Sequence, residues 1–228
     1  MSRVAIITAR GGSKRIPKKN IKKFCGKPII AYSIVAAMES KVFDEVMVST
    51  DSEEIKAVAE AYGAAVPFSR SDATSNDYAT TADVLKEVLE KYEELGKQFD
   101  SFVCIYPTAP FVTGARLAEA AELLNDADAV LSVVKFSFPP QRAFVIRDGS
   151  VKFQYPQYER ARSQDLEPCY HDCGQFYMCR TRAFLERHSL ILPRTKPYIL
   201  PEEEVQDIDT MSDWMIAEAK YKVLLKGK

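Results

Sequence analysis

Hydrophobic residues in the first half of the chain alternate between short continuous runs and helical stripes. Residues 4–7 and 101–106 form nearly unbroken apolar runs, which are typical of strands buried on both faces of a parallel sheet. Apolar residues recur at helical spacing around 29–37 and 84–89, and turn residues bound each stripe. Shorter strands are expected at 45–49 and 64–68. The order predicts an open, mostly parallel sheet with helices on both faces and 101–106 near its centre.

The second half of the chain continues this pattern with one interruption. We expect strands at 129–134, 176–179 and 198–200, and helices at 113–124, 182–187 and 209–225. A polar segment, 69–80, is longer than a minimal connection requires, which makes it a candidate for function. We expect residues 1–228 to form a single domain.

The interruption is the segment 136–168, where prolines, aromatic residues and arginines alternate. Asp148-Gly149 predicts the turn of a β-hairpin, and the segment has too little apolar mass for a core of its own. We expect an inserted arm that packs against a second subunit, which predicts a homodimer. The composition leaves open an alternative in which the hairpin folds over its own sheet.

Overall composition excludes several classes of partner. Of the 228 residues, 46% are hydrophobic, which supports a sizeable core. The net charge is −1, so no global field attracts nucleic acid or a membrane surface. No apolar run reaches the length of a membrane span, and no signal-peptide pattern precedes the first strand. The five scattered cysteines favour reduced thiols, and we expect a cytoplasmic protein.

The loop after the first strand carries the clearest chemical signal. It joins Gly11 and Gly12 to a cluster of basic residues that includes Arg10 and Lys14. Glycines allow backbone amides to turn toward an anion, and the basic side chains add charge, so the loop is suited to a polyphosphate. The spacing matches neither a P-loop nor a dinucleotide-binding fingerprint. A basic surface turn remains the alternative.

Two carboxylates near the C-terminus predict a metal site. Asp207 and Asp209 are two residues apart on an extended segment, so they share a side and repel each other unless a cation lies between them. Mg²⁺ suits such a pair when phosphate oxygens complete its shell. The alternative is that Asp209 caps the last helix, with Asp213 in its first turn. Zinc is disfavoured around Cys169 and Cys173, because C-x₃-C is not the usual knuckle spacing.

Several motifs occur in the order seen in one enzyme family. They are A-R-G-G-S-K-x-I-P-x-K-N from Ala9 to Asn20, Arg70, Pro107-Thr108-Ala109-Pro110, Arg162-Ser163-Gln164-Asp165-Leu166 and Asp207-Ile208-Asp209-Thr210. Together they resemble the acylneuraminate cytidylyltransferases, the CMP-sialic acid synthetase-like enzymes that activate acidic sugars with CTP. The variants at 105–110 and 169–174 look closer to the pseudaminic acid branch. The resemblance implies a Rossmann-like α/β fold of the nucleotide-diphospho-sugar transferase type.

The resemblance also implies an activity. The chain is expected to transfer CMP from CTP to an acidic nine-carbon (nonulosonic) sugar, pseudaminic acid above all, with release of pyrophosphate and with Mg²⁺ as cofactor. Sialic acid, legionaminic acid and Kdo are alternative acceptors. A regulatory module that binds CTP without turnover is the non-enzymatic alternative, and the presence of both Asp207 and Asp209 argues against it.

Residue roles follow from the matched positions. The catalytic group is expected to comprise Arg10, Lys19 and Asp209, and the metal ligands Asp207 and Asp209. The nucleotide-binding group is expected to comprise Arg10, Gly11, Gly12, Ser13, Lys14, Asn20, Arg70 and Thr81. Sugar contacts are expected from Tyr106, Arg142, Arg160, Arg162, Gln164 and Asp165. The three arginines are proposed because a sugar carboxylate needs cationic donors, although dimer contacts or solvation would explain them equally well.

Two positions depart from the sialic acid pattern. Tyr106 stands where glutamine is common, and Cys173 stands where asparagine is common. Both changes remove an amide near the expected sugar, which favours a less hydroxylated acceptor such as pseudaminic acid.

Overall fold

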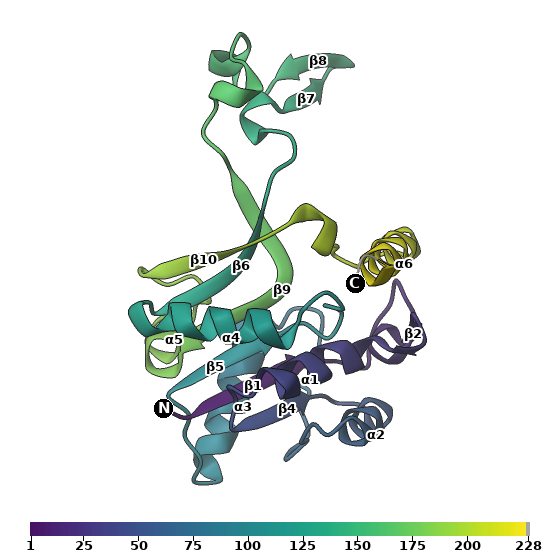
Figure 1. The fold of residues 1–228 in the computed structure, drawn as a ribbon, viewed down its shortest axis with the longest axis vertical. Helices are drawn as coiled ribbons and strands as arrows, with labels where there is room; N and C mark the ends of the chain where they lie inside the picture. Colours follow the sequence, from purple (N-terminus) through teal and green to yellow (C-terminus); the bar gives the residue numbers. More distant parts are fainter. Residues whose placement is uncertain (227–228) are drawn as a thin grey trace.

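The computed structural model describes residues 1–226 and is built around one six-stranded sheet (Figure 1). The strand order is β10-β6-β9-β5-β1-β4, and β9 runs antiparallel to its neighbours while the others are parallel. The strands are β1 (Arg3–Thr8), β4 (Glu45–Ser49), β5 (Ser101–Ile105), β6 (Ala129–Lys135), β9 (Tyr170–Arg180) and β10 (Thr195–Leu200). The mostly parallel sheet and the central position of residues 101–105 are therefore confirmed.

Helices cover both faces of the sheet, as expected. One face carries α1 (Ile29–Ser40), α2 (Glu53–Ala61) and α4 (Gly114–Leu123), and the other carries α3 (Thr81–Glu94) and α5 (Thr181–Arg187). Along β1, Ala5 and Ile7 pack toward the first layer while Val4 and Ile6 pack toward the second. All four side chains are fully buried, which explains why the strand is a continuous apolar run rather than an alternating one.

A third apolar cluster joins the C-terminal helix to the loop after β1. The helix α6 (Met211–Lys226) places Trp214 against Phe24, which lies in the small hairpin β2 (Lys23–Phe24) and β3 (Lys27–Pro28). Ile16 from the basic loop belongs to the same cluster. The loop is therefore anchored at its far end by buried apolar contacts. No helix in residues 1–226 has the length and apolar character that a membrane crossing would need.

The strand expected at 64–68 is wrong. Only Ala65 pairs there, through a single bridge to Met47 of the edge strand β4. Pro67 has no amide hydrogen to extend the pairing, so the chain leaves the sheet edge. It returns at Arg70, whose amide donates to the Thr50 carbonyl at 2.9 Å.

Strand β9 is longer than the expected 176–179 and contains an irregularity next to the cleft described below. Its register against β6 shifts, so that Tyr177 pairs with Leu131 but Asp172 pairs with Val133. The Ser132 hydroxyl fills the gap by bonding both the amide and the carbonyl of Phe176. Gly174 lies in this bulge with φ +63°, and Asp172 Oδ1 accepts its amide at 2.8 Å. Such bulges bend a strand and redirect its side chains.

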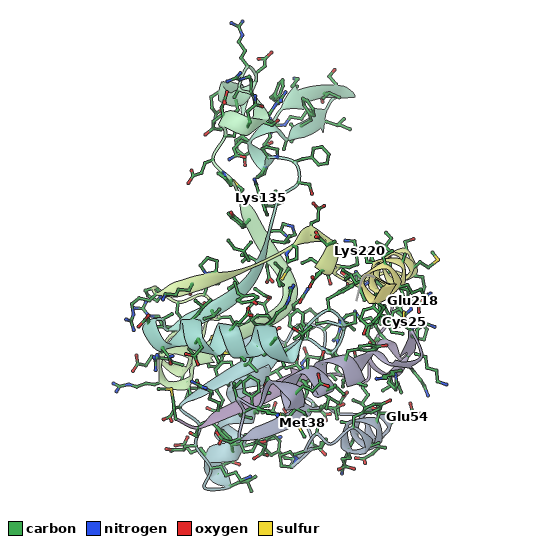
Figure 2. The ribbon with its side chains drawn as sticks, in the orientation of Figure 1. Cys25, Met38, Glu54, Lys135, Glu218 and Lys220 are labelled. Atoms are coloured by element: carbon green, nitrogen blue, oxygen red, sulfur yellow. The ribbon has the colours of Figure 1, made fainter. Side chains whose placement is uncertain are left out.

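Residues 136–168 stand away from the sheet as an arm, at the top of Figure 1. The arm contains the predicted hairpin, β7 (Phe144–Arg147) and β8 (Ser150–Phe153), with Asp148 and Gly149 at its turn. Figure 2 shows Lys135 at the neck where β6 leaves the sheet. Ile146 and Val151 are 77% and 65% exposed, so the hairpin does not fold over its own sheet and this alternative is wrong.

Candidate active site

A polar cleft of about 600 Å³ opens beyond the carboxyl ends of β1 and β5. This is the edge at which open parallel sheets hold their ligands. Its lining comes from the basic loop, the turn after β5, one residue of the 69–80 segment and one residue before α6. The lining residues are Thr8, Arg10, Ser13, Lys14, Arg15, Ile16, Lys19, Asn20, Asp77, Tyr106, Pro107, Thr108 and Asp209.

Two cations of the basic loop share one carboxylate across the cleft. Arg10 Nη1 lies 2.8 Å from Asp77 Oδ1, and Lys14 Nζ pairs with the other oxygen of the same group. Arg10 also donates to the Asn76 carbonyl at 2.8 Å. Hydrogen bonds from Lys14 and Arg10 lower the pKa of Asp77, so its carboxylate is ionised at neutral pH. Behind the loop, buried Asn20 donates to the Arg10 carbonyl at 2.9 Å and fixes the backbone there.

The two adjacent glycines have different surroundings. The Gly11 amide donates to Asp51 Oδ1 at 2.7 Å, so in this structure it faces the turn before α2. A Cβ on Gly11 would lie 3.1 Å from Ser52 Cβ, which explains the need for glycine at this close approach. Gly12 has open space around its Cβ position. Neither glycine is among the residues that line the cleft.

Asp207, Asp209 and Lys19 form one electrostatic group. Asp209 Oδ1 lies 2.7 Å from Arg15 Nη2 and 3.8 Å from Lys19 Nζ, and Lys19 also donates to the Ile208 carbonyl at 2.8 Å. Burial raises the pKa of Asp207, and the Asp209 charge raises it further while Lys19 opposes both. Burial lowers the pKa of Lys19, and the two carboxylates partly offset this.

The cap of α6 leaves Asp209 available to the cleft. Asp213 Oδ2 accepts the Thr210 amide at 2.7 Å, and Thr210 Oγ1 accepts the Asp213 amide at 3.3 Å. This reciprocal pair is a capping box with Thr210 as the cap. The alternative in which the Asp209 side chain caps the helix is therefore wrong, because that side chain points to Arg15 and Lys19 instead.

The carboxylate pair fits a magnesium ion. Mg²⁺ takes one or two protein carboxylates and completes its octahedral shell with phosphate oxygens and water. Asp207 and Asp209 supply such a pair beside the basic loop, and burial first and the charge of Asp209 second raise the pKa of Asp207. Within residues 1–226, no three or more His, Cys, Asp and Glu side chains cluster closely enough to hold a metal by themselves.

Arg70 lies behind the cleft rather than on its lining. Its guanidinium donates to the Thr74 carbonyl, but its Nε is buried without a partner in the described chain. Burial lowers the pKa of Arg70, with Asp51 and Glu87 opposing the effect. A buried donor without an acceptor is costly, so Nε is a ready donor for a ligand carbonyl or ring nitrogen.

Tyr106 forms part of one wall of the cleft, and the buried Tyr177 supports it. The Tyr106 hydroxyl lies 3.3 Å from Thr81 Oγ1 and 3.5 Å from the Tyr177 hydroxyl, which donates to Asp172. Burial raises the pKa of Tyr106. A Cβ on Gly174 would lie 3.8 Å from the Tyr106 ring and 3.9 Å from Asp207 Oδ1, so the bulge of β9 separates this wall from the carboxylate pair.

Cys173 does not face the cleft. Its side chain is 3% exposed and packs with Val134 and Leu200 in a separate apolar cluster. The expectation that this side chain lies near a sugar is therefore wrong, because alternate residues of a strand point to opposite faces.

The arm residues are not brought to the cleft of their own chain. Arg162 forms a two-point ion pair with Asp165, at 2.7 and 3.2 Å, and Arg142 lies 3.4 Å from Ser163 Oγ. Arg160 and Gln164 are exposed. Across the part of the chain that the structure describes, the arm contributes none of the cleft-lining residues.

Sequence reasoning thus located part of the site. The structure brings together Arg10, Ser13, Lys14, Lys19, Asn20, Tyr106 and Asp209 around one cleft, with Asp207 coupled to them by charge. It adds Arg15, Asp77, Asp172 and Tyr177, to which no role was given. The unusual length of the polar 69–80 segment was the signal for Asp77.

Comparisons with known proteins agree with this geometry. A family model described as cytidylyltransferase matches residues 4–200. The chain is 40% identical over 226 residues to a pseudaminic acid cytidylyltransferase of Campylobacter jejuni subsp. jejuni, with 98% of this chain and 97% of that protein covered. It is 35% identical to a CMP-N,N'-diacetyllegionaminic acid synthase of Legionella pneumophila subsp. pneumophila, with 94% of each chain covered.

A solved structure extends the likeness to the fold. The CTP complex of CMP:2-keto-3-deoxy-manno-octonic acid synthetase superposes with a TM-score of 0.70 at 18% identity, covering 99% of this chain and 100% of that one. At this identity the similarity concerns the fold alone. It agrees with the mostly parallel sheet and its two helical layers.

Proposed function

The chain belongs to the cytidylyltransferase family, and from this premise we propose that it transfers CMP from CTP to pseudaminic acid and releases pyrophosphate. The observation that carries the proposal is the cleft itself. It is lined by the cations Arg10, Lys14 and Lys19 together with Asp209 of the carboxylate pair, which is the charge pattern that a metal-bound triphosphate requires.

The reaction is a displacement at the α-phosphorus. The anomeric hydroxyl of the sugar forms the new P–O bond, the bond to the β-phosphate breaks, and pyrophosphate leaves, while the hydroxyl proton is lost to water in the open cleft. The protein's part is to position the reactants and to stabilise the charge on the phosphate oxygens. Arg10, Ser13 and Lys14 hold the β- and γ-phosphates, and Lys19, which lies deeper, neutralises the α-phosphate.

Mg²⁺ is the proposed cofactor, held by Asp207 and Asp209. When bound, it neutralises phosphate charge and aligns the leaving group. The chain's own residues prepare this site, because Lys19 and Arg15 hold Asp209 toward the loop in which the phosphates are placed.

We propose that the nucleotide base lies near Arg70 and Thr81, at the border of the cleft formed by Tyr106. Arg70 offers its unpaired Nε to the O2 or N3 acceptor of cytosine, and Thr81 supplies a hydroxyl next to Tyr106. Asn20 supports the loop backbone between the base and the phosphates. Gly12 remains the glycine proposed to offer an amide to phosphate, since the Gly11 amide bonds Asp51.

The sugar is placed against the Tyr106 wall, and we propose that a second subunit completes this side. The hairpin of the arm carries Phe144, Ile146 and Val151, and residues 1–226 leave these side chains largely exposed. A homodimer in which each arm reaches the other chain would cover these side chains and bring Arg142, Arg160, Arg162, Gln164 or Asp165 near the partner's sugar. Light scattering at micromolar concentration tests the dimer, and a monomer refutes it.

Pyrophosphate release measured with purified protein, CTP and a panel of acidic sugars tests the activity. We expect Mg²⁺-dependent release, fastest with pseudaminic acid and slower with legionaminic acid, sialic acid and Kdo. UTP in place of CTP is the matched nucleotide control. No release with any sugar would refute the transferase, whereas a preference for sialic acid would refute only the choice of sugar.

A further inference from the structure

The carboxylate of Asp77 occupies the two cations that the proposed function assigns to the triphosphate. Its two oxygens pair separately with Arg10 and with Lys14, and all three residues line the cleft. Every other acidic partner of the basic loop has an evident local role. Asp209 belongs to the proposed metal site, Asp51 accepts the Gly11 amide, and Glu54 on α2 pairs with Lys18 at 2.7 Å.

Asp77 is carried by a segment whose base is anchored to α3 and whose tip is exposed. At the base, Glu87 on α3 accepts the Ser71 amide and hydroxyl, each at 2.8 Å, and also bonds Thr74. At the tip, the neighbouring Tyr78 is 93% exposed. The Asn76 side chain donates to the Ala73 carbonyl at 2.8 Å and accepts the Tyr78 and Ala79 amides, so the tip is braced within its own segment. Toward the basic loop, its contacts are those of Asn76 and Asp77 with Arg10 and Lys14. Little packing is lost if the tip moves.

A polyphosphate and Asp77 cannot both keep these partners. The same guanidinium and ammonium would have to serve two sets of anionic oxygens, and a carboxylate left beside the phosphates would repel them. Hydrogen bonds from Lys14 and Arg10 lower the pKa of Asp77, so the group does not escape this conflict by protonation at neutral pH.

We propose that Asp77 is an internal competitor of the nucleotide's phosphates. It pairs with Arg10 and Lys14 until the triphosphate displaces it, and it pairs with them again as pyrophosphate leaves. This inference rests on the proposed phosphate site and adds a residue that weakens nucleotide affinity in exchange for faster product release. The tip of the 69–80 segment then moves with the state of the cleft, while its anchored base keeps Thr74 against Arg70, the proposed reader of the nucleotide base.

Calorimetric titration of the full chain with inorganic pyrophosphate in EDTA tests the inference without the metal or the sugar. For Asp77→Asn we expect the Kd for pyrophosphate to fall roughly twofold to fivefold at low salt, because two exposed ion pairs no longer compete. The gain should shrink at high salt, where exposed charges are screened. Asp72→Asn is the matched control, because it makes the same charge change on the same segment at an exposed side chain.

Two outcomes would overturn the inference, and they are distinguishable. An unchanged or higher Kd in Asp77→Asn, with wild-type binding intact, would show that Asp77 positions the cations rather than competing for them. Equal gains in Asp72→Asn and Asp77→Asn would reduce the effect to net charge. Absence of pyrophosphate binding to the wild type would instead refute the proposed phosphate site. In a Lys14→Ala background, the gain from Asp77→Asn should be smaller, since one competing pair is already gone.

Discussion

Replacing Gly174 by alanine tests the bulge that separates the tyrosine wall from the carboxylate pair. The backbone there has φ +63°, a left-handed conformation that costs an L-residue about 1–2 kcal/mol. Alanine also lowers the conformational entropy of the unfolded chain, which stabilises the folded state by about 0.4–1 kcal/mol. The new methyl group meets the Tyr106 ring at 3.8 Å and Asp207 Oδ1 at 3.9 Å, both ordinary contacts, so no clash adds to the cost. The net loss of unfolding free energy is therefore about 1 kcal/mol.

For a chain of this length, such a loss lowers Tm by about 2–4 °C, which thermal unfolding followed by circular dichroism resolves. Gly96→Ala is the matched control. Gly96 has φ +74° and open space around its Cβ position, and it lies after α3, outside the cleft lining. Both variants should lose similar stability for the same backbone reason.

The two variants should differ in kinetics. The methyl group of Gly174→Ala projects between Tyr106 and Asp207, on the side proposed for the sugar, where one extra carbon in a pocket is worth about 1–3 kcal/mol. Because the cleft is open, we expect the lower end of this range, roughly a tenfold higher KM for the sugar with the KM for CTP unchanged. Gly96→Ala should change neither. An unchanged Tm in Gly174→Ala would refute the left-handed bend, and an unchanged sugar KM would remove the sugar from this wall.

Four further predictions concern the metal, the phosphates, the arm and pH. Asp209→Asn should lower kcat at least about 100-fold with an unchanged circular dichroism spectrum, because it removes a ligand of the charge-stabilising metal; near-normal turnover at low Mg²⁺ would contradict the metal site. Lys14→Ala should raise the KM for CTP roughly tenfold, by loss of one charged hydrogen bond at an exposed site, with the sugar KM unchanged; the reverse pattern in initial-rate kinetics would contradict the phosphate assignment. Deletion of 136–168 should give a monomer in light scattering with a defective sugar KM, and a dimer of the shortened chain would contradict the proposed interface. Burial raises the pKa of Glu87, but hydrogen bonds from Lys91, Thr74 and Ser71 outweigh it and hold the pKa at about 2. Because this value lies below the unfolded one, the stabilisation is present above about pH 4.5 and is lost as the pH falls toward 2; urea unfolding should thus show a wild-type advantage over Glu87→Gln that disappears on acidification.

The local periodicity of the sequence predicted most of the fold. The runs at β1 and β5 are buried on both faces, so they carry an unambiguous signal, and the stripes of α1 and α3 are equally clear. The prediction of a strand at 64–68 failed because these apolar residues pack beside the edge of the sheet. Periodicity cannot distinguish such packing from pairing within the sheet. The antiparallel direction of β9 also has no local signature, since it depends on the path of the chain through the arm.

The site was predicted where its residues are close in sequence and missed where they meet only in space. The basic loop and the Asp207–Asp209 pair are short motifs, and the sequence alone shows their clustered charges. The partnership of Asp77 with Arg10 and Lys14 spans more than 60 residues, and no spacing rule predicts it. Whether Thr210 or Asp209 caps α6 depended on which side chain turns back to the helix, which the structure settles.

The position of β9 also governs the order in which the sheet can assemble. It lies between β5 and β6 but follows the arm in the sequence, so the three strands β4, β1 and β5 and the single strand β6 are synthesised before it, and β10 is synthesised after it. A nascent chain that ends before residue 170 exposes one unpaired edge of β5 and both edges of β6, and exposed strand edges are templates for aggregation. Insertion of β9 joins β5 to β6, and β10 then pairs with the other edge of β6, which gives the topology a high contact order. Pairing of β6 with β9, the two strands that flank the arm, is therefore the event that commits the chain to its native sheet.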